Sequence, residues 1–150
     1  MKSLLENDYV VFAARVLLGM VFLVASIDKV ADPAAFAVSI QNYKIISQPF
    51  TMLVATILPW VELLCALGLL FGFRIKASAF LCFIMLLVFT LGVVSGLIRG
   101  LDISCGCFTQ DPSVGRIGWT KVFENVGMLL VALMLLFSRG KKFAIEKDIQ

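Results

Sequence analysis

The sequence predicts an all-α membrane protein, a single-domain bundle of four transmembrane helices over residues 1–150. Composition is the first reason, since 61% of the residues are hydrophobic and only 15% are charged. An ordinary soluble domain is about half apolar and about one quarter charged. Pattern is the second reason. Four predominantly apolar runs reach about 20 residues, the length that spans a bilayer, and they lack the polar face that a soluble bundle helix needs.

The first run covers residues 9–30 and is expected to be the first span. It is too long for the apolar core of a signal peptide, and "VASIDK" near its end is a weak cleavage site, so we interpret it as a retained anchor. The next residues read "DPAAF". Asp32 suits a helix cap and Pro33 suits the first helical turn. A short amphipathic helix from Pro33 to about Tyr43 is therefore expected at the outer surface. Its apolar residues, expected to cover the mouth of the bundle, are Phe36, Val38 and Ile40.

The second, third and fourth spans are expected at residues 50–73, 76–98 and 119–138. The turn "FGFRIK" between the second and third is short, so these two should be antiparallel neighbours. Pro59 lies inside the second span and is expected to kink it. Trp60 and Trp119 are expected to be anchors at the membrane interface.

The distribution of basic residues predicts the orientation. Four spans put both termini and the short turn on one side, which carries Lys2, Arg74, Lys76, Arg139, Lys141, Lys142 and Lys147. The other side carries Lys29, Lys44, Arg99, Arg116 and Lys121. The positive-inside rule then places both termini in the cytoplasm of a bacterial inner membrane. Since the basic residues are scattered and not interleaved with aromatic ones, no nucleic-acid partner is expected.

A Cys-Gly-Cys unit in the last loop is the main candidate for chemistry. The segment "GLDISCGCFTQD" holds Cys105, Gly106, Cys107 and Phe108. A disulfide between such close cysteines would close a small strained ring, which makes the bond labile and suited to exchange. Gly106 would supply the backbone freedom that the ring needs. The predicted orientation puts this loop outside the cytoplasm, where disulfides persist. We therefore predict that Cys105 and Cys107 are catalytic, with Gly106 and Phe108 in support.

Two other interpretations of the pair stay open. The cysteines could be inert reduced thiols, or each could bond to a cysteine of another protein. A metal site is not expected, because the chain has no histidine and two thiolates leave a zinc ion two ligands short. The absence of histidine also excludes histidine-based catalytic triads.

Ionisable residues inside the spans are the second candidate group, because charges at that depth are expensive and usually paired or functional. Glu62 lies in the second span, and its expected partner is Arg15 in the first. Lys29 is the rival partner. Such a pair either holds the bundle together or shapes a polar pocket. Cys65 and Cys82 are interpreted as small buried hydrophobes. The 13 phenylalanines are mostly core and lipid contacts, although a flat apolar ligand such as a quinone is a candidate cofactor.

Three stretches resemble one family. They are "RVLLGMVFLVASIDKVADPAAFAVSIQNYKII", "ILPWVELLCALGLLFG" and "RGLDISCGCFTQDPSVGRIGW". Together they are similar to the MauE branch of the DoxX-like membrane proteins, over about Arg15 to Glu124. The residues that fall on the family pattern outside the cysteine loop are Arg15, Gly19, Lys29, Pro59, Trp60 and Glu62. The chain departs from the pattern at Thr109, where glycine is frequent, and at Glu124, near which an arginine is frequent.

The resemblance implies a four-helix bundle similar to vitamin K epoxide reductase-like proteins and a role in disulfide chemistry outside the cytoplasm. The expected function is a membrane thiol–disulfide oxidoreductase or disulfide-maturation factor. Its partners would be membrane lipid and a thioredoxin-like or other cysteine-containing protein. Two alternatives remain. One is a non-enzymatic assembly or scaffold subunit, and the other is a small-solute binder or transporter that uses Glu62.

Overall fold

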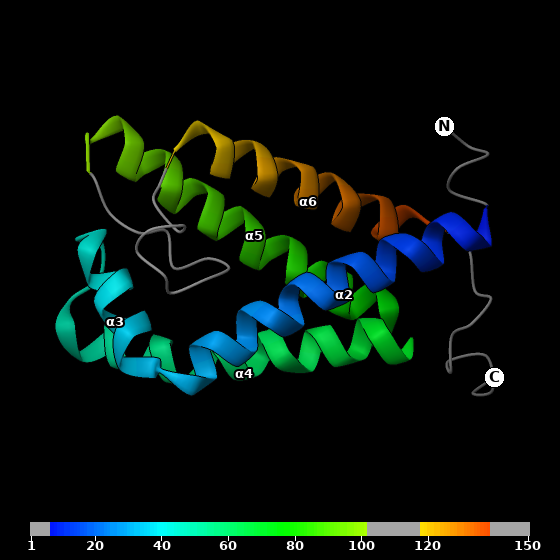
Figure 1. Ribbon diagram of the computed structural model, residues 1–150, viewed down its shortest axis with the longest axis horizontal. Helices are drawn as coiled ribbons and strands as arrows, with labels where there is room; N and C mark the ends of the chain where they lie inside the picture. Colours follow the sequence, from blue (N-terminus) through cyan, green and yellow to red (C-terminus); the bar gives the residue numbers. More distant parts are fainter. Residues whose placement is uncertain (1–6, 102–117, 139–150) are drawn as a thin grey trace.

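The computed structural model describes residues 7–101 and 118–138, and within them every regular element is a helix. The helices follow in the order α2 (Asp8–Ala31), α3 (Pro33–Asn42), α4 (Gln48–Phe71), α5 (Ile75–Ile98) and α6 (Trp119–Phe137) (Figure 1). Four of them are long and apolar enough to cross a membrane. Their ends agree with the expected spans to within two residues, so the four-helix membrane fold is confirmed.

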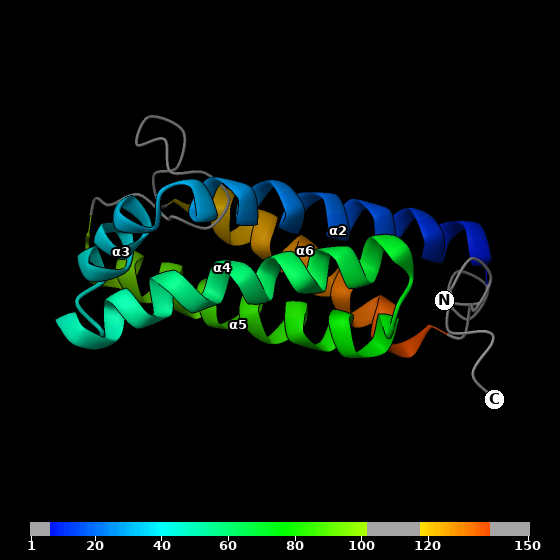
Figure 2. The same cartoon turned by 90° about the horizontal axis from the view of Figure 1, so that it is seen from below.

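The four long helices pack in two pairs. Helix α2 runs along α4, α5 runs along α6, and the short α3 packs against α4 at one end of the bundle (Figures 1 and 2). The main core contains Leu18, Phe22, Leu69 and Leu86, each at most 2% exposed. Large apolar side chains also cover the outside of the bundle. Because an apolar surface of that extent is unfavourable in water, it suits a lipid environment.

Helix α3 forms for the expected reasons. Asp32 caps it through a carboxylate oxygen that accepts a hydrogen bond from the Ala35 amide at 2.9 Å, and Pro33 occupies the first turn. The expectation for its apolar face was wrong at one position. Phe36 is 1% exposed, whereas Val38 is 55% exposed. Two residues advance a helix by about 200°, so Val38 points away from the face on which Phe36 and Ile40 lie.

The bundle has two distinct ends. We call the end that carries α3, the start of α4 and the end of α5 the α3 end, and the other end, where α2 begins, the terminal end (Figure 2). Leu101 and Gly118, which bound the last loop, both belong to the α3 end. There the Arg99 guanidinium donates a hydrogen bond to the Tyr43 carbonyl at 2.8 Å. This contact joins the end of α5 to the connection between α3 and α4.

At the terminal end, α4 and α5 are joined by the tight turn that the sequence predicts. Gly72 ends α4 with a φ of 72°, and its amide donates to the Gly68 carbonyl. This left-handed conformation favours glycine. The two helices approach closely just inside the turn, because a Cβ atom built on Gly68 would overlap the Ser78 hydroxyl. They are antiparallel neighbours, as expected.

Candidate functional site

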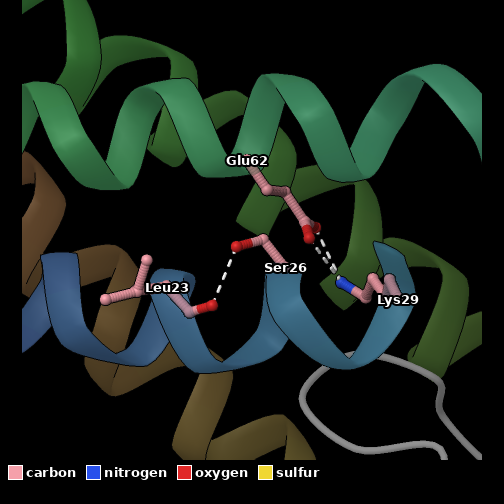
Figure 3. Close-up of polar contacts among 4 residues, drawn as sticks. All are labelled: Leu23, Ser26, Lys29 and Glu62. Carbon is pink, nitrogen blue, oxygen red and sulfur yellow. Dashed lines mark hydrogen bonds and ion pairs between the residues drawn. The ribbon is translucent and has the colours of Figure 1, made fainter. Parts of the chain in front are cut away.

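A buried ion pair joins the last turn of α2 to the middle third of α4. The Lys29 ammonium of α2 donates to both carboxylate oxygens of Glu62 on α4, at 2.7 and 2.9 Å (Figure 3). Each side chain is 1% exposed. The Lys29 nitrogen also lies 5.0 Å from the ring centroid of Phe36 and 4.8 Å from that of Phe89. The ammonium is therefore surrounded by one carboxylate and two aromatic rings, contributed by α3, α4 and α5.

The local sequence explains how these groups come together. Lys29 lies in the last turn of α2, and its long stem lets the ammonium reach Glu62. Glu62 follows Pro59 by three residues, and α4 remains a single helix through this proline. Ser26, one turn before Lys29, is buried and satisfies its hydroxyl by donating to the Leu23 carbonyl at 2.8 Å (Figure 3).

The expected pairing of Glu62 with Arg15 was wrong, because Lys29 holds both of its carboxylate oxygens. The expectation placed the ends of α2 and α4 at one level, but the helices are shifted along their axes. Gly19 of α2 lies level with Ala66 and Leu70 of α4, since a Cβ atom built on Gly19 would meet both residues. Arg15 lies one turn from Gly19 towards the terminal end, whereas Glu62 lies one turn from Ala66 towards the α3 end. That separates them by about 12 Å along the axis.

Arg15 instead packs on a side chain of its own helix. It is 3% exposed, and its guanidinium carbon lies 5.2 Å from the ring centroid of Phe12, one turn earlier in α2. Trp60 lies on the outside of the bundle at 55% exposure, about 18 Å along α4 from its first residue. Trp119, the first residue of α6, is 68% exposed. The position at a helix end expected for an interfacial anchor therefore fits Trp119 and not Trp60.

Sequence reasoning missed Asn125. It is 1% exposed on α6, and neither side-chain amide atom has a hydrogen-bond partner among the residues described. Val122, one turn earlier, packs near Phe89 and Val93 of α5. Asn125 therefore lies towards the bundle interior at about the level of the ion pair. An amide inside an apolar span was the available signal, since such groups are costly in a bilayer unless bonded.

An apolar pocket opens beside the ion pair, between α3, α4 and α5. Its volume is about 350 Å³, and its lining includes Phe36, Tyr43, Leu58, Val88, Phe89 and Gly92. Phe36 and Phe89 thus contact both the pocket and the Lys29 ammonium. Tyr43 is the one residue with a polar side chain in this lining, as far as the described residues show. Burial raises the pKa of its hydroxyl to about 12, so it stays neutral at physiological pH. The lining therefore suits an apolar ligand.

Four of the predicted site residues, Cys105, Gly106, Cys107 and Phe108, lie outside the described residues. The structure brings together Lys29 and Glu62, and leaves Arg15 and Trp60 apart from them. Within residues 7–101 and 118–138, no group of three or more acidic or cysteine side chains could hold a metal ion.

The fold and the site define a multi-pass membrane protein, a four-helix bundle with a charged pair enclosed in its interior. Residues 7–138 match the family described as methylamine utilisation protein MauE. The chain belongs to the MauE family, as the resemblance implied, and is a multi-pass bacterial membrane protein.

Curated relatives agree with this family. The methylamine utilization protein MauE of Paracoccus denitrificans is 28% identical over 150 residues, which cover 99% of this chain and 79% of the relative. The protein of the same name from Methylophilus methylotrophus is 27% identical over 134 residues, covering 89% of this chain and 70% of the relative. No solved structure shows a significant match.

Proposed function

We propose that this protein is a membrane accessory protein in methylamine utilisation, because its relatives are named methylamine utilization proteins. We propose further that it works by thiol–disulfide exchange. Cys105 and Cys107 are the exchanging residues. The partner is a thioredoxin-like or other cysteine-containing protein outside the cytoplasm, and membrane lipid surrounds the bundle. Both termini lie in the cytoplasm in this proposal.

The proposal rests on one observation, namely that the loop with the two cysteines begins and ends at the α3 end of a bundle held together by a buried ion pair. Leu101 and Gly118 lie at this end, and the sequence places Cys105 four residues after Leu101. Within the bundle, the Lys29–Glu62 ion pair ties α2 to α4, with Phe36 of α3 against the ammonium. A loop that exchanges disulfides with a partner needs a rigid base. The enclosed pair supplies one, since its two charges hold each other in place away from water.

The chemistry balances without a metal. A thiolate of the reduced partner attacks one sulfur of the Cys105–Cys107 disulfide, forms a mixed disulfide and releases the other cysteine as a thiolate. The partner's second thiolate then attacks the mixed disulfide. The partner leaves as a disulfide, and Cys105 and Cys107 have gained two electrons and two protons. The reverse sequence oxidises the pair.

One alternative loses support from the site. A transporter that binds solute at Glu62 needs that carboxylate to be available, but both of its oxygens accept bonds from Lys29 in a position that is 1% exposed. A scaffold subunit with structural cysteines would keep the same bundle, so the state of the thiols is what separates it from an oxidoreductase.

Acid quenching and alkylation in cells test the proposal. The two loop cysteines are replaced one at a time, by Cys105→Ser and by Cys107→Ser. One of these two variants should lack the thiol that resolves the mixed disulfide. That variant should accumulate a mixed disulfide with a partner protein, visible as a larger species on a non-reducing gel. The matched control is Cys65→Ala with Cys82→Ala, which leaves the loop pair intact and should not accumulate the species.

Full function of Cys105→Ser/Cys107→Ser, with no change in the redox state of the native pair during growth, would reject the oxidoreductase and leave the scaffold. Function is measured as growth on methylamine in a host that depends on this chain.

The apolar pocket favours one addition, namely a quinone as the electron carrier for the pair. Gly92 lines the pocket, so Gly92→Leu should fill part of it and reduce the quinone absorbance of the purified protein. Gly127→Leu is the control, because a Cβ atom there meets nothing within 4 Å. Equal quinone content in both variants would remove the quinone from the proposal.

A further inference from the structure

Two more cysteines face each other in the interior of the bundle. Cys65 of α4 is 3% exposed and Cys82 of α5 is 0% exposed, and both belong to the main core. Both are free thiols, and they lie on the two helices that the turn at Gly72 joins. Sequence reasoning interpreted each as an isolated small hydrophobe. Both belong to one core cluster, on neighbouring helices, so they can act as a dithiol.

The packing of the two helices supports this pairing independently. Gly68 and Ser78 approach so closely that a Cβ atom on Gly68 would overlap the Ser78 hydroxyl. Helices α4 and α5 are antiparallel. One turn from Gly68 towards the α3 end, α4 carries Cys65, and one turn from Ser78 towards the same end, α5 carries Cys82. The two cysteines therefore occupy facing positions one turn from the point where Ser78 of α5 packs on Gly68 of α4. A disulfide needs Cα atoms within about 7 Å of each other, a separation that such an approach favours.

We propose that Cys65 and Cys82 form a second thiol–disulfide couple, inside the membrane, that is oxidised by apolar organic disulfides dissolved in the bilayer. The first thiol attacks the organic disulfide, forms a mixed disulfide and releases one organic thiol. The second cysteine attacks the mixed disulfide and releases the other organic thiol. The two electrons and both protons leave with the organic thiols, so the closed Cys65–Cys82 bond leaves no charge in the apolar core.

The surroundings of the two thiols favour an apolar oxidant over a charged one. The thiols are almost fully enclosed between helices whose outer surfaces are apolar, so a charged reagent would have to enter a region of low dielectric. The couple does not depend on the function proposed for the loop cysteines.

The experiment uses the full chain with Cys105→Ser and Cys107→Ser, which leaves Cys65 and Cys82 as the only cysteines. The protein in lipid vesicles is treated with 2,2′-dithiodipyridine, which is apolar, or with 5,5′-dithiobis(2-nitrobenzoate), which is charged. With the apolar reagent we expect two equivalents of thiopyridone per chain, a mass decrease of two hydrogens, and loss of both thiols to maleimide after denaturation. The charged reagent should react with native protein at least tenfold more slowly.

A variant that exchanges two buried residues is the matched control. Cys82→Ala with Ala79→Cys keeps the composition but moves one thiol by a turn, out of reach of Cys65. Ala79 is 0% exposed, so both thiols stay buried, and thermal unfolding checks that the variant folds. Each of its thiols should keep a pyridylthio adduct, and no internal disulfide should form.

Two outcomes would overturn the proposal. One is two stable adducts on the Cys65/Cys82 chain, and the other is no reaction of native protein under conditions in which denatured protein reacts. Either outcome leaves the mixed-disulfide test of the loop cysteines untouched, because those cysteines are absent here.

Discussion

At the scale of single residues, the Lys29–Glu62 pair is a buried charge contact that joins α2 to α4. Taking two charges out of water is expensive, and the mutual attraction repays the expense only when both partners are present and well bonded. Here Lys29 has two short bonds to Glu62 and lies near two ring faces. Each residue is therefore far more costly alone than the two are together.

Lys29→Met should destabilise the protein by about 3–5 kcal/mol, since it leaves Glu62 buried without a cation. The double variant Lys29→Met/Glu62→Leu should recover most of that loss, because two apolar side chains replace the pair and no charge remains. Thermal unfolding in detergent, followed by circular dichroism, measures both changes.

The exposed pair of Lys121 and Glu124 is the control for this prediction. Their bond is similarly short, at 2.8 Å, but the side chains are 19% and 48% exposed. Lys121→Met should cost less than about 1 kcal/mol. Equal losses at Lys29 and Lys121 would contradict the view that burial gives the first pair its importance.

Asn125 allows a second prediction at this scale. A buried amide without a hydrogen-bond partner costs about 1–3 kcal/mol, and neither amide atom of Asn125 has a partner among the described residues. Leucine has the same number and branching of side-chain heavy atoms as asparagine but no polar atom, so Asn125→Leu should raise the unfolding temperature in detergent. A lower unfolding temperature would mean instead that a water molecule or another group satisfies the amide in the working protein.

At the scale of helices, sequence predicts each element well and the contacts between elements poorly. Apolar runs and the Asp32 cap set where helices begin and end, because these signals are local in the chain. The contacts of Glu62 depend on the axial shift of α4 against α2, which small residues such as Gly19 determine in three dimensions. For the same reason the partner of Cys65 could not be predicted. Lys29, the rival partner of Glu62, proved to be the actual one.

The close approach of α4 and α5 gives a prediction at this scale. Gly68→Ala should destabilise the bundle by about 1–3 kcal/mol, because the added methyl group overlaps the Ser78 hydroxyl and pushes the helices apart. Gly127→Ala should have no such effect and should gain up to about 1 kcal/mol of helix propensity, because it has open space. Chemical unfolding in detergent compares the two. Ser78→Gly should rescue Gly68→Ala, and failure of this rescue would show that another contact is responsible.

At the scale of the whole molecule, the two ends of the bundle must face different compartments. The α3 end carries the bounds of the cysteine loop, and the terminal end carries the turn between α4 and α5. The proposed chemistry requires the α3 end to face outwards, where disulfides persist. The preference of basic residues for the cytoplasmic side favours the same orientation, so it can be tested apart from any redox activity.

Single cysteines in a chain whose four native cysteines are replaced by serine provide that test. Ser47 and Phe73 are both exposed, Ser47 before α4 at the α3 end and Phe73 in the turn at the terminal end. In intact spheroplasts, a membrane-impermeant maleimide should label Ser47→Cys at once, whereas Phe73→Cys should react only after lysis. The reverse pattern would put the α3 end in the reducing cytosol. Disulfide exchange at Cys105 and Cys107 with an extracytoplasmic partner would then be ruled out, whereas the Cys65–Cys82 couple, enclosed between α4 and α5, would be unaffected.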